Sequence, residues 1–254
     1  MTEKPTGKPL AMITGAAKRV GLATATTFAK LGFDLVITYR SSREHAHEAA
    51  AELRKLGANV RLEQLDLDRL GDVIERGLRL AKELRRLDVL VHNASIYEPT
   101  PLKELVPEQV LTHLRINAAA PLLLSKHLAA RLAESPLPAG GAIVAMCDMH
   151  ALGRPRKDFV AYSMSKAALA EMVQSLAREL APKVRVNGVA PGVVAFPESG
   201  KESDPEMQKQ YLSRVPMQRS GTPEDAAEIV RWLALDAAYT TGEIVRVDGG
   251  RWLA

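Results

Sequence analysis

The sequence predicts an α/β fold in which seven parallel strands form one sheet covered by helices on both faces. Short apolar runs alternate with segments of helical spacing from about residue 10 onward. The runs are apolar at nearly every position, as strands buried on both faces are, and the segments between them are long enough for helical crossovers. With 254 residues, 46% of them hydrophobic, the chain can bury the core that such a sheet needs.

In the first half of the chain, each apolar run is followed by a segment of helical spacing. Residues 10–14 are apolar and lead to Gly15, and apolar residues then recur at helical spacing over 20–31 until Gly32 ends the pattern. The same sequence of strand and helix repeats three more times. These elements are strand 34–38, helix 44–56, strand 59–65, helix 70–84, strand 88–92 and helix 107–132.

In the second half, a long helical segment separates two apolar runs. Strand 142–146 precedes helix 161–180, strand 184–189 follows it, and 243–247 is the last strand. Strands that alternate with helices throughout the chain favour a doubly wound, Rossmann-type arrangement.

The domain organisation is expected to be simple. Residues 10–254 form a single domain in this interpretation, preceded by a disordered polar tail at 1–9. The stretch 195–219 contains Pro and Gly and lacks strand or helix periodicity. Such an interruption inside a compact domain is more often a substrate loop or lid than a second domain.

Charge and cysteine content restrict the function classes. Lys and Arg number 34 and Asp and Glu 30, and the basic residues are spread among the acidic ones, which argues against a nucleic-acid partner. Cys147 is the only cysteine and the start of the chain has no apolar signal segment, so a cytoplasmic location is expected. No apolar run approaches the roughly 18–20 residues of a membrane helix. No Cys, His or carboxylate spacing matches a zinc site, and no metal is expected.

The turn between the first strand and the first helix has the composition of a phosphate-binding turn. Gly15 and Gly21 allow the backbone to approach a pyrophosphate at the helix N-terminus, where free N–H groups and the helix dipole favour anions. Lys18 and Arg19 add positive charge. A turn with two glycines is also compatible with a tight turn that binds nothing. Its position after the first strand of this fold is what favours a dinucleotide site.

The end of the second strand indicates which dinucleotide is bound. An NAD site usually carries an acid there, whereas this chain has Tyr39, Arg40 and Ser41. A guanidinium beside hydroxyl groups suits a 2′-phosphate, so NADPH is predicted over NADH. The alternative is that Arg40 is an exposed turn residue. Asp66, after the third strand, either covers the adenine or caps the following helix.

Tyr162 and Lys166 are the candidate proton donor and its supporting cation. Their i,i+4 spacing at the start of a helix places the phenol and the ammonium on one face. A nearby cation favours the phenolate and so lowers the pKa of a tyrosine, which otherwise titrates near pH 10. The pair occurs by chance on many helices, and its position after the fifth strand favours the catalytic interpretation.

Over residues 10–253 the sequence resembles the short-chain dehydrogenase/reductase family. The segment His92-Asn93-Ala94-Ser95 stands where that family has Asn-Asn-Ala-Gly, and Asn117 matches its helical asparagine. The resemblance implies that Asn93 supports the central strand, that Ala94 and Ser95 border the cofactor, and that Asn117 acts in catalysis by holding a water linked to Lys166.

The same resemblance has implications near the C-terminal end of the chain. Pro191 and Gly192 match the family's Pro-Gly and are expected to flank the nicotinamide. A homotetramer is also implied, with long helices and the region of Trp252 packed between subunits.

At three places where the chain departs from the common family pattern, its residues are similar to those of the pteridine reductases. Arg19 replaces the usual middle glycine of the first turn, and the segment Tyr39-Arg40-Ser41 resembles their 2′-phosphate segment. Tyr97, close after Ser95, stands where they place an aromatic ring that stacks on the pterin. Ser95 and Tyr97 are therefore expected to contact substrate, although Tyr97 could instead be a packed loop residue.

A fourth departure concerns the catalytic serine of ketone-reducing members. Near its expected place, about 13 residues before Tyr162, the chain has Met149, preceded by Asp148. Pteridine reductases have an aspartate here, and Asp148 is the candidate, although its spacing of 14 to Tyr162 is one residue too long. A carboxylate beside the phenol opposes tyrosinate formation, so Tyr162 is expected to stay protonated while Asp148 relays or supplies the proton and contacts substrate. Alternatively, Asp148 only caps the turn after strand five.

These features predict an NADPH-dependent reductase of a dihydropteridine- or dihydrofolate-like ring, a small-molecule enzyme with no nucleic-acid or membrane partner. Two alternatives remain open. One is an NADPH-dependent carbonyl reductase such as a 3-oxoacyl-carrier-protein reductase, which would need an active-site hydroxyl. The other is a catalytically silent NADP-binding sensor, against which the intact Tyr162, Lys166 and Asn117 argue.

Overall fold

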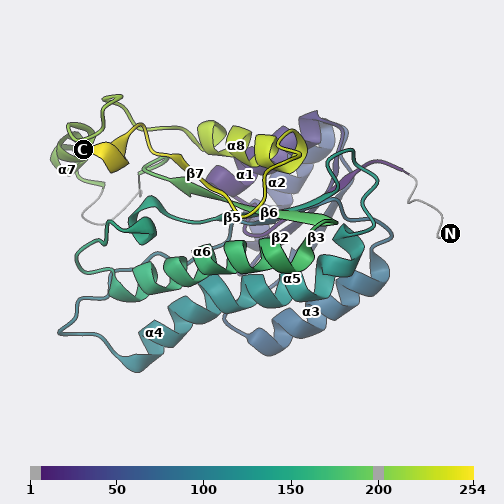
Figure 1. Cartoon of the computed structure of the whole chain (residues 1–254), viewed down its shortest axis with the longest axis horizontal. Helices are drawn as coiled ribbons and strands as arrows, with labels where there is room; N and C mark the ends of the chain where they lie inside the picture. Colours follow the sequence, from purple (N-terminus) through teal and green to yellow (C-terminus); the bar gives the residue numbers. More distant parts are fainter. Residues whose placement is uncertain (1–6, 197–202) are drawn as a thin grey trace.

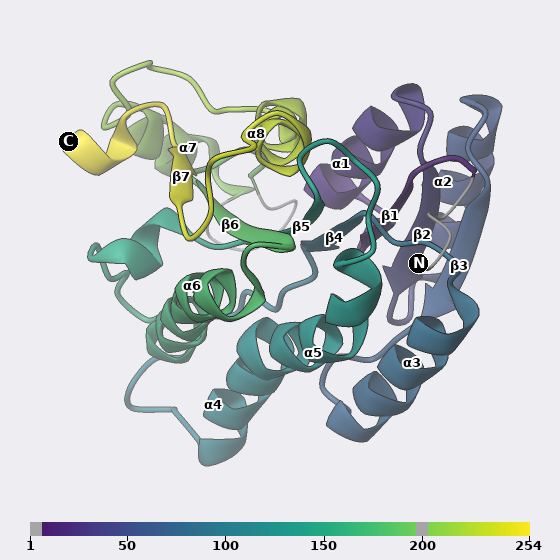
Figure 2. The same cartoon turned by 45° about the vertical axis from the view of Figure 1, so that its right-hand side comes forward.

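A parallel sheet of seven strands forms the centre of the molecule in a computed structural model, which describes residues 7–196 and 203–254. The order is β3-β2-β1-β4-β5-β6-β7, as the sequence predicts for a doubly wound fold (Figures 1 and 2). Because the chain winds outward in opposite directions from β1 and β4, a crevice opens beyond the carboxyl ends of these two strands. The strands are β1 Leu10–Ile13, β2 Asp34–Tyr39, β3 Val60–Gln64, β4 Val89–His92, β5 Gly141–Met146, β6 Val184–Pro191 and β7 Ile244–Val247.

Helices cover both faces of the sheet (Figure 1). On one face lie α1 Arg19–Lys30, α2 Arg43–Lys55 and α8 Pro223–Leu235. On the other lie α3 Leu70–Glu83, α5 Ala120–Leu132 and α6 Val160–Leu180, with α4 Pro107–Leu114 against α6.

Alternate residues of each strand enter the two cores. In β1, Ile13 packs with Phe28 of α1 while Met12 packs with Leu128 of α5, and all four are fully buried. Each such side chain contributes about 1.5–3 kcal/mol on removal from water. Continuous apolar strands are therefore required by a sheet that is buried on both faces.

The described part of the long interruption contains a helix that the periodicity did not predict. Within 195–219, α7 Pro205–Leu212 begins after Asp204, whose side chain accepts hydrogen bonds from the backbone N–H groups of Glu206 and Met207. Residues 197–202 lie outside the described residues. The expected loop at 195–219 is thus partly helical.

Helix α8 was also absent from the expectations, although its signals are present in the sequence. The Thr222 hydroxyl accepts from the Asp225 backbone N–H, and the Asp225 carboxylate accepts from that of Thr222, which forms a capping box. Pro223 occupies the first helical position, where its missing N–H costs nothing.

The helix expected at 107–132 is divided. Residues Arg115–Ala119 form one π-helical turn, η1, between α4 and α5. The wider turn carries Asn117, and inserted turns of this kind are frequent at functional sites.

The expected tail at 1–9 is also only partly described. Residues 1–6 lie outside the described residues, whereas Gly7, Lys8 and Pro9 make hydrogen bonds to other parts of the domain. The Pro9 carbonyl accepts from the Asp34 N–H at 2.8 Å, which begins the pairing of β1 with β2. Residues 7–9 therefore do not behave as the disordered tail that their composition predicts.

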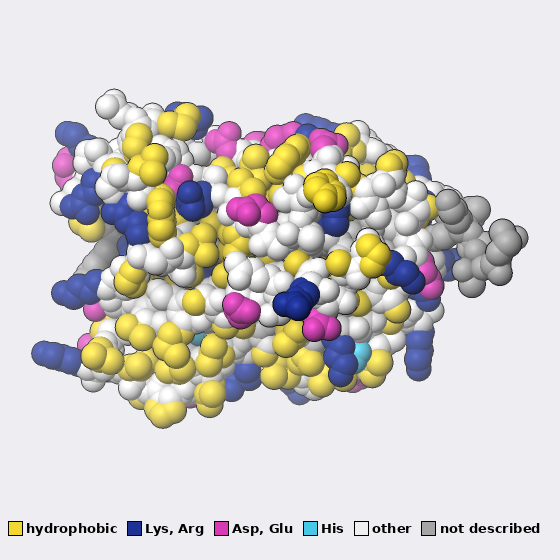
Figure 3. All heavy atoms as spheres, in the orientation of Figure 1, with side chains coloured by type: hydrophobic (Ala, Val, Ile, Leu, Met, Phe, Trp, Pro, Cys, Tyr) yellow, Lys and Arg dark blue, Asp and Glu magenta, His cyan; other side chains and the backbone are white. Residues whose placement is uncertain are grey.

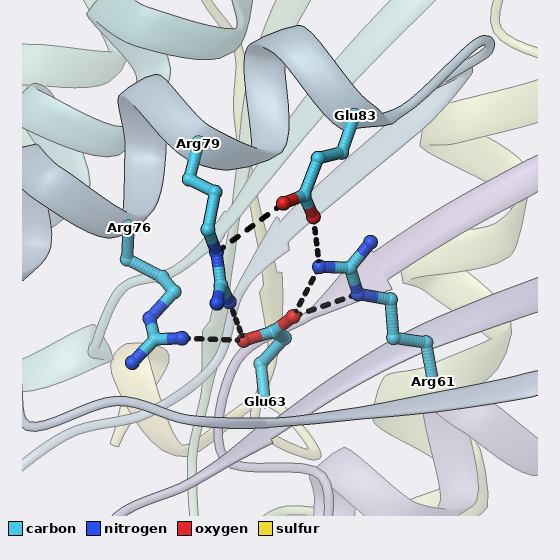
Figure 4. Close-up of polar contacts among 5 residues, drawn as sticks. All are labelled: Arg61, Glu63, Arg76, Arg79 and Glu83. Carbon is cyan, nitrogen blue, oxygen red and sulfur yellow. Dashed lines mark hydrogen bonds and ion pairs between the residues drawn. The ribbon is translucent and has the colours of Figure 1, made fainter.

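A network of charges holds the edge strand β3 against α3 (Figure 4). The Glu63 carboxylate is 5% exposed and accepts from Arg61 at 2.7 Å, Arg76 at 3.1 Å and Arg79 at 2.5 Å. Glu83 binds Arg61 from the other side at 2.5 Å. A nearly buried carboxylate with three cationic partners has its charge compensated, and its loss would leave Glu83 as the anion for Arg61 and Arg79.

None of the helices in the described residues is both long enough and apolar enough to span a bilayer.

Candidate active site

The Tyr162 hydroxyl and the Asp148 carboxylate form the centre of the candidate site. Tyr162 lies in the first turn of α6 and donates a hydrogen bond to Asp148 Oδ2 at 2.6 Å. Asp148 also caps the short helix η2 Met149–Leu152, because its Oδ1 accepts from the His150 N–H at 2.6 Å. The two interpretations of Asp148, as cap and as partner of the phenol, therefore both describe its geometry.

The surroundings keep Tyr162 protonated. Burial, and then the Asp148 carboxylate, raises the pKa of this phenol well above its ordinary value of 10. Met149, at the position of the family serine, is fully buried.

Lys166 lies one turn further along α6. Its ammonium donates to the Met146 carbonyl at 2.7 Å and lies 5.9 Å from the centroid of the Tyr162 ring. Burial lowers the pKa of Lys166, since the charged form is removed from water.

Asn117 connects the π-helical turn to the site. Its Oδ1 accepts from the Ile96 N–H at 2.9 Å and from the Ser95 hydroxyl at 3.1 Å. Its amide nitrogen donates to the Ile96 carbonyl at 3.0 Å and to the Ser165 hydroxyl at 2.9 Å. Asn117 thus fixes the segment after β4 against α6.

The first turn is packed so tightly that two glycines are required. Gly15 has φ +66°, and a Cβ there would lie 2.9 Å from the Ala94 Cβ. At Gly21 a Cβ would lie 2.4 Å from the Gly15 carbonyl oxygen and 2.6 Å from Asn93 Nδ2. Asn93 Nδ2 donates to the carbonyls of Thr14 and Gly15 at 2.9 and 3.0 Å, so it joins β4 to this turn.

A cavity of about 430 Å³ opens beside this turn and has the composition of a dinucleotide site. Among the residues that line it are Lys18 before α1 and Arg40 after β2. Asp66 lines it too, and its carboxylate accepts from the Asp68 N–H at 3.1 Å, so it also shapes the turn before α3. The other predicted residues in its wall are Gly15, Tyr39, Ser41, Ala94, Ser95 and Tyr97.

Arg19 does not line this cavity. It has φ +53°, and its guanidinium donates to the carbonyls of Ala195 and Phe196, at 2.8 and 3.1 Å, in the segment after β6.

Pro191 ends β6, and Gly192 N–H donates to the Val247 carbonyl at 2.9 Å. A Cβ on Gly192 would lie 3.1 Å from the Asp248 Cα, so the strand end stays close to β7.

Tyr97 joins an aromatic group at the mouth of the site. Its ring stacks on Phe159 with centroids 4.7 Å apart and meets the Tyr162 ring edge-on at 4.8 Å. Its hydroxyl accepts from Arg156, whose guanidinium lies 4.7 Å from the Phe159 centroid. The sequence interpretation did not include Phe159 or Arg156, because no short motif joins residues 60 positions apart.

No group of three or more His, Cys, Asp and Glu side chains able to hold a metal ion occurs in the part of the chain that the structure describes.

Comparison with known proteins is in keeping with this architecture. A family model described as enoyl-(acyl carrier protein) reductase matches residues 15–251. The chain belongs to the short-chain dehydrogenase/reductase family. Members of this family are oxidoreductases that use NAD(P), and the residues around the 430 Å³ cavity fit such a cofactor.

Relatives at similar identity have different names. The chain is 32% identical to the uncharacterized oxidoreductase YohF of Escherichia coli, covering 96% of both chains. It is 30% identical to dihydromonapterin reductase of Enterobacter, covering 94% of this chain and 95% of that one, and 32% identical to pteridine reductase 1 of Leishmania tarentolae, covering 98% of both. The solved structure of acetoin dehydrogenase YohF from Salmonella typhimurium superposes with a TM-score of 0.86 at 29% identity, covering 98% and 97% of the two chains.

Proposed function

We propose that this chain is an NADPH-dependent reductase of a C=N bond in a pterin ring, similar in action to the pteridine reductases. The observation that carries the proposal is the 2.6 Å hydrogen bond from the Tyr162 hydroxyl to the Asp148 carboxylate. A ketone-reducing member of the family is expected to have a serine hydroxyl near this position, where this chain has Met149. The names of two relatives, dihydromonapterin reductase and pteridine reductase 1, add support.

The chemistry requires a hydride at the ring carbon and a proton at the ring nitrogen. A bound nicotinamide cofactor supplies the hydride. Tyr162 holds the proton, because burial and Asp148 keep its pKa well above 10. As the ring nitrogen takes the phenolic proton, a proton from solvent passes through the Asp148 carboxylate to the phenol oxygen, so that Tyr162 is protonated again. Lys166 and Asn117 act as positioning residues, because they fix the strand end and the loop around Tyr162.

Cofactor selection is assigned to the end of β2. Arg40 and Ser41 border the cavity where a ribose 2′-phosphate would bind, and Lys18 adds a cation. Asp66 would contact the adenine, and Pro191 and Gly192 would border the nicotinamide. No acidic residue occurs in the segment Tyr39-Arg40-Ser41-Ser42, which supports NADPH over NADH.

Substrate stacking is assigned to Tyr97. Its ring lines the cofactor cavity and is 38% exposed, so one aromatic face can accept a flat heterocycle. Ser95 lies at the same edge.

Assembly of copies through an apolar face is part of the proposal. Hydrophobic side chains gather along the lower edge of the molecule, the side of α4 and α6 (Figure 3). The exposed hydrophobic residues of α4, α5 and α6 include Leu111, Leu122, Val160 and Met164. A homotetramer would cover this face, and its mass in solution can be measured by analytical ultracentrifugation.

The test is NADPH oxidation by the purified protein with dihydrobiopterin, dihydromonapterin, dihydrofolate and an acetoacetyl thioester compared side by side. Turnover of the pterins supports the proposal. Turnover of the thioester alone would instead assign the carbonyl reductase activity to this site, and NADPH binding without any turnover would favour the sensor. Tyr162→Phe should lower pterin turnover about 100-fold or more while NADPH binding stays within about twofold.

A further inference from the structure

A second cavity, of about 540 Å³, lies beside the candidate active site and is lined by an excess of cationic side chains. No Asp or Glu side chain is among its lining residues in the described ranges 7–196 and 203–254. Its cationic residues are Arg154, Arg156, Lys157, Arg214 and Arg251, and His150 completes the wall. In Figure 3 Lys and Arg side chains gather at the end of the molecule that carries α7 and the C-terminal segment.

Arg251 is the most buried of these cations and has an unused donor. Its side chain is 9% exposed, Nη1 donates to the Ala254 carbonyl at 3.0 Å, and the guanidinium lies 5.5 Å from the Tyr211 ring centroid. Its Nε is buried without a hydrogen-bond partner. Buried donors are almost always paired in folded proteins, so the guanidinium of Arg251 keeps hydrogen-bonding capacity that the described residues do not use.

Hydrogen bonds between distant segments fix the wall of the cavity. Arg154 Nη1 donates to the carbonyls of Arg251 and Trp252 at 2.7 and 2.9 Å. The Arg154 carbonyl in turn contacts His150 Nδ1 at 3.0 Å. The segment after β5 and the C-terminal segment are thereby joined across 97 positions of the chain, which holds the guanidinium groups in place.

The cavity adjoins the reacting groups at two points. Arg156, in its wall, donates to the hydroxyl of Tyr97, whose ring meets that of Tyr162 at 4.8 Å. His150, also in its wall, donates its backbone N–H to the Asp148 carboxylate at 2.6 Å. Two residues of the cavity wall thus contact Tyr97 and Asp148, which in turn contact Tyr162.

We propose that this cavity binds an anionic tail of the substrate, carboxylate or phosphate, attached to the ring that is reduced. This inference rests on the proposed pterin reductase function. Guanidinium groups donate in pairs to carboxylate and phosphate oxygens, and a cleft of one charge sign raises the local concentration of such anions. A neutral tail could accept hydrogen bonds from these groups but would lack the charge that they attract.

The test compares tails on one ring, using the full chain with saturating NADPH. Dihydrofolate is compared with its triglutamate for carboxylates, and dihydroneopterin with its 3′-phosphate for phosphate. Arg214→Gln and Lys157→Gln each remove one cavity cation, and Lys209→Gln is the matched control, because Lys209 lies on α7 beside lining residues but outside the lining.

Each cavity variant should raise KM for the preferred tailed substrate about three- to fivefold, and the double variant about tenfold, as expected for partly exposed ion pairs. KM for dihydroneopterin should stay within about twofold in every variant, and Lys209→Gln should change neither KM. Added salt should raise KM for the tailed substrates more than for dihydroneopterin, because it screens the charges. Calorimetric binding of the same four pterins to the NADP⁺ complex should give the same order in Kd.

The outcomes separate the two proposals. Preference for the triglutamate assigns the cavity to carboxylates, and preference for the 3′-phosphate assigns it to phosphate. Equal KM and Kd for tailed and untailed pterins, unchanged in the variants, would overturn the anionic-tail inference and leave pterin reduction standing. If no pterin binds or reacts while the acetoacetyl thioester is reduced, the proposed function fails, and the inference fails with it.

Discussion

Replacing Asp148 by Asn should lower the pKa of Tyr162. The amide keeps the size and an acceptor oxygen but removes the negative charge that faces the phenol at 2.6 Å. A hydrogen bond to a charged group contributes about 1.5–3 kcal/mol and a neutral one about 0.5–1.5 kcal/mol. The difference, roughly 1–1.5 kcal/mol, is lost from the protonated phenol in the variant, which favours its ionisation. The sign follows from charge, because a carboxylate opposes formation of a second anion beside it.

The assay is a spectrophotometric titration of tyrosinate in matched pairs of proteins. Subtracting the titration curve of Tyr162→Phe from that of the wild type isolates the titration of Tyr162. The same difference between Asp148→Asn and the double variant Asp148→Asn/Tyr162→Phe gives the pKa of Tyr162 without the carboxylate. In pterin turnover, loss of the relay should lower kcat by about 10²–10⁴. NADPH affinity should stay within about twofold.

Asp158→Asn is the matched control. Asp158 is exposed and has φ +64°, a conformation that asparagine tolerates well. Its backbone carbonyl accepts from the Thr100 N–H, and the substitution leaves that hydrogen bond in place. This variant should change neither the Tyr162 pKa nor kcat. An unchanged or higher Tyr162 pKa in Asp148→Asn would refute the assignment of Asp148 as the charge that keeps the phenol protonated.

Three further predictions test the cofactor site and the fold. Arg40→Ala should weaken NADPH binding about tenfold in a fluorescence titration and leave NADH binding unchanged. The control Arg43→Ala, outside the cavity, should change the affinity for neither dinucleotide. Equal losses for both dinucleotides in Arg40→Ala would contradict a 2′-phosphate contact. Burial lowers the pKa of His92 to about 3, so the folded state favours neutral His92 and loses stability as pH falls from 6.5 toward 3, by about 2 kcal/mol at pH 5. Urea unfolding of the wild type and His92→Asn at pH 5 and 7.5 measures this effect, and the variant should lose about 2 kcal/mol less stability between the two pH values. An equal loss in the wild type and the variant would show that His92 is not the cause. Glu63→Gln should cost about 2–3 kcal/mol of unfolding free energy, because three arginines lose a nearly buried anion. Glu83→Gln, at the exposed side of the network, should cost clearly less, and equal costs would show that burial of Glu63 is not what matters.

The seven strands and most helices follow from the sequence because burial on both faces imposes a simple pattern. A strand between two layers of helices must be apolar at every position, as in Leu90, which faces one core, and Val89, which faces the other. Helix α8 could have been predicted too, since Thr222 and Asp225 form a capping box before apolar residues at helical spacing. The π-helical turn at Asn117 could not, because it depends on contacts with Ile96 and Ser165 that exist only in the folded chain.

In the candidate site, too, residues that lie close in the sequence could be predicted, whereas contacts between distant segments could not. Tyr162 and Lys166 are found from their spacing, and Asp148 from its place after β5. The extra residue between Asp148 and Tyr162 is accommodated by the short helix η2 and by Gly153 at φ +108°, so the hydrogen bond forms despite the longer spacing. The cationic cavity has no sequence signature, because Arg154 and Arg251 are brought together only by the fold.

Arg19 links the two cavities and explains why a position that commonly holds glycine can carry a charged side chain. A residue other than glycine at φ +53° costs about 1–2 kcal/mol. Two hydrogen bonds from its guanidinium to the carbonyls of Ala195 and Phe196, at about 1 kcal/mol each even when exposed, offset that cost. Arg19 lies in the turn beside the cofactor cavity, and Phe196 lines the cationic cavity. The turn beside the cofactor cavity and a segment that lines the cationic cavity are therefore joined by one side chain.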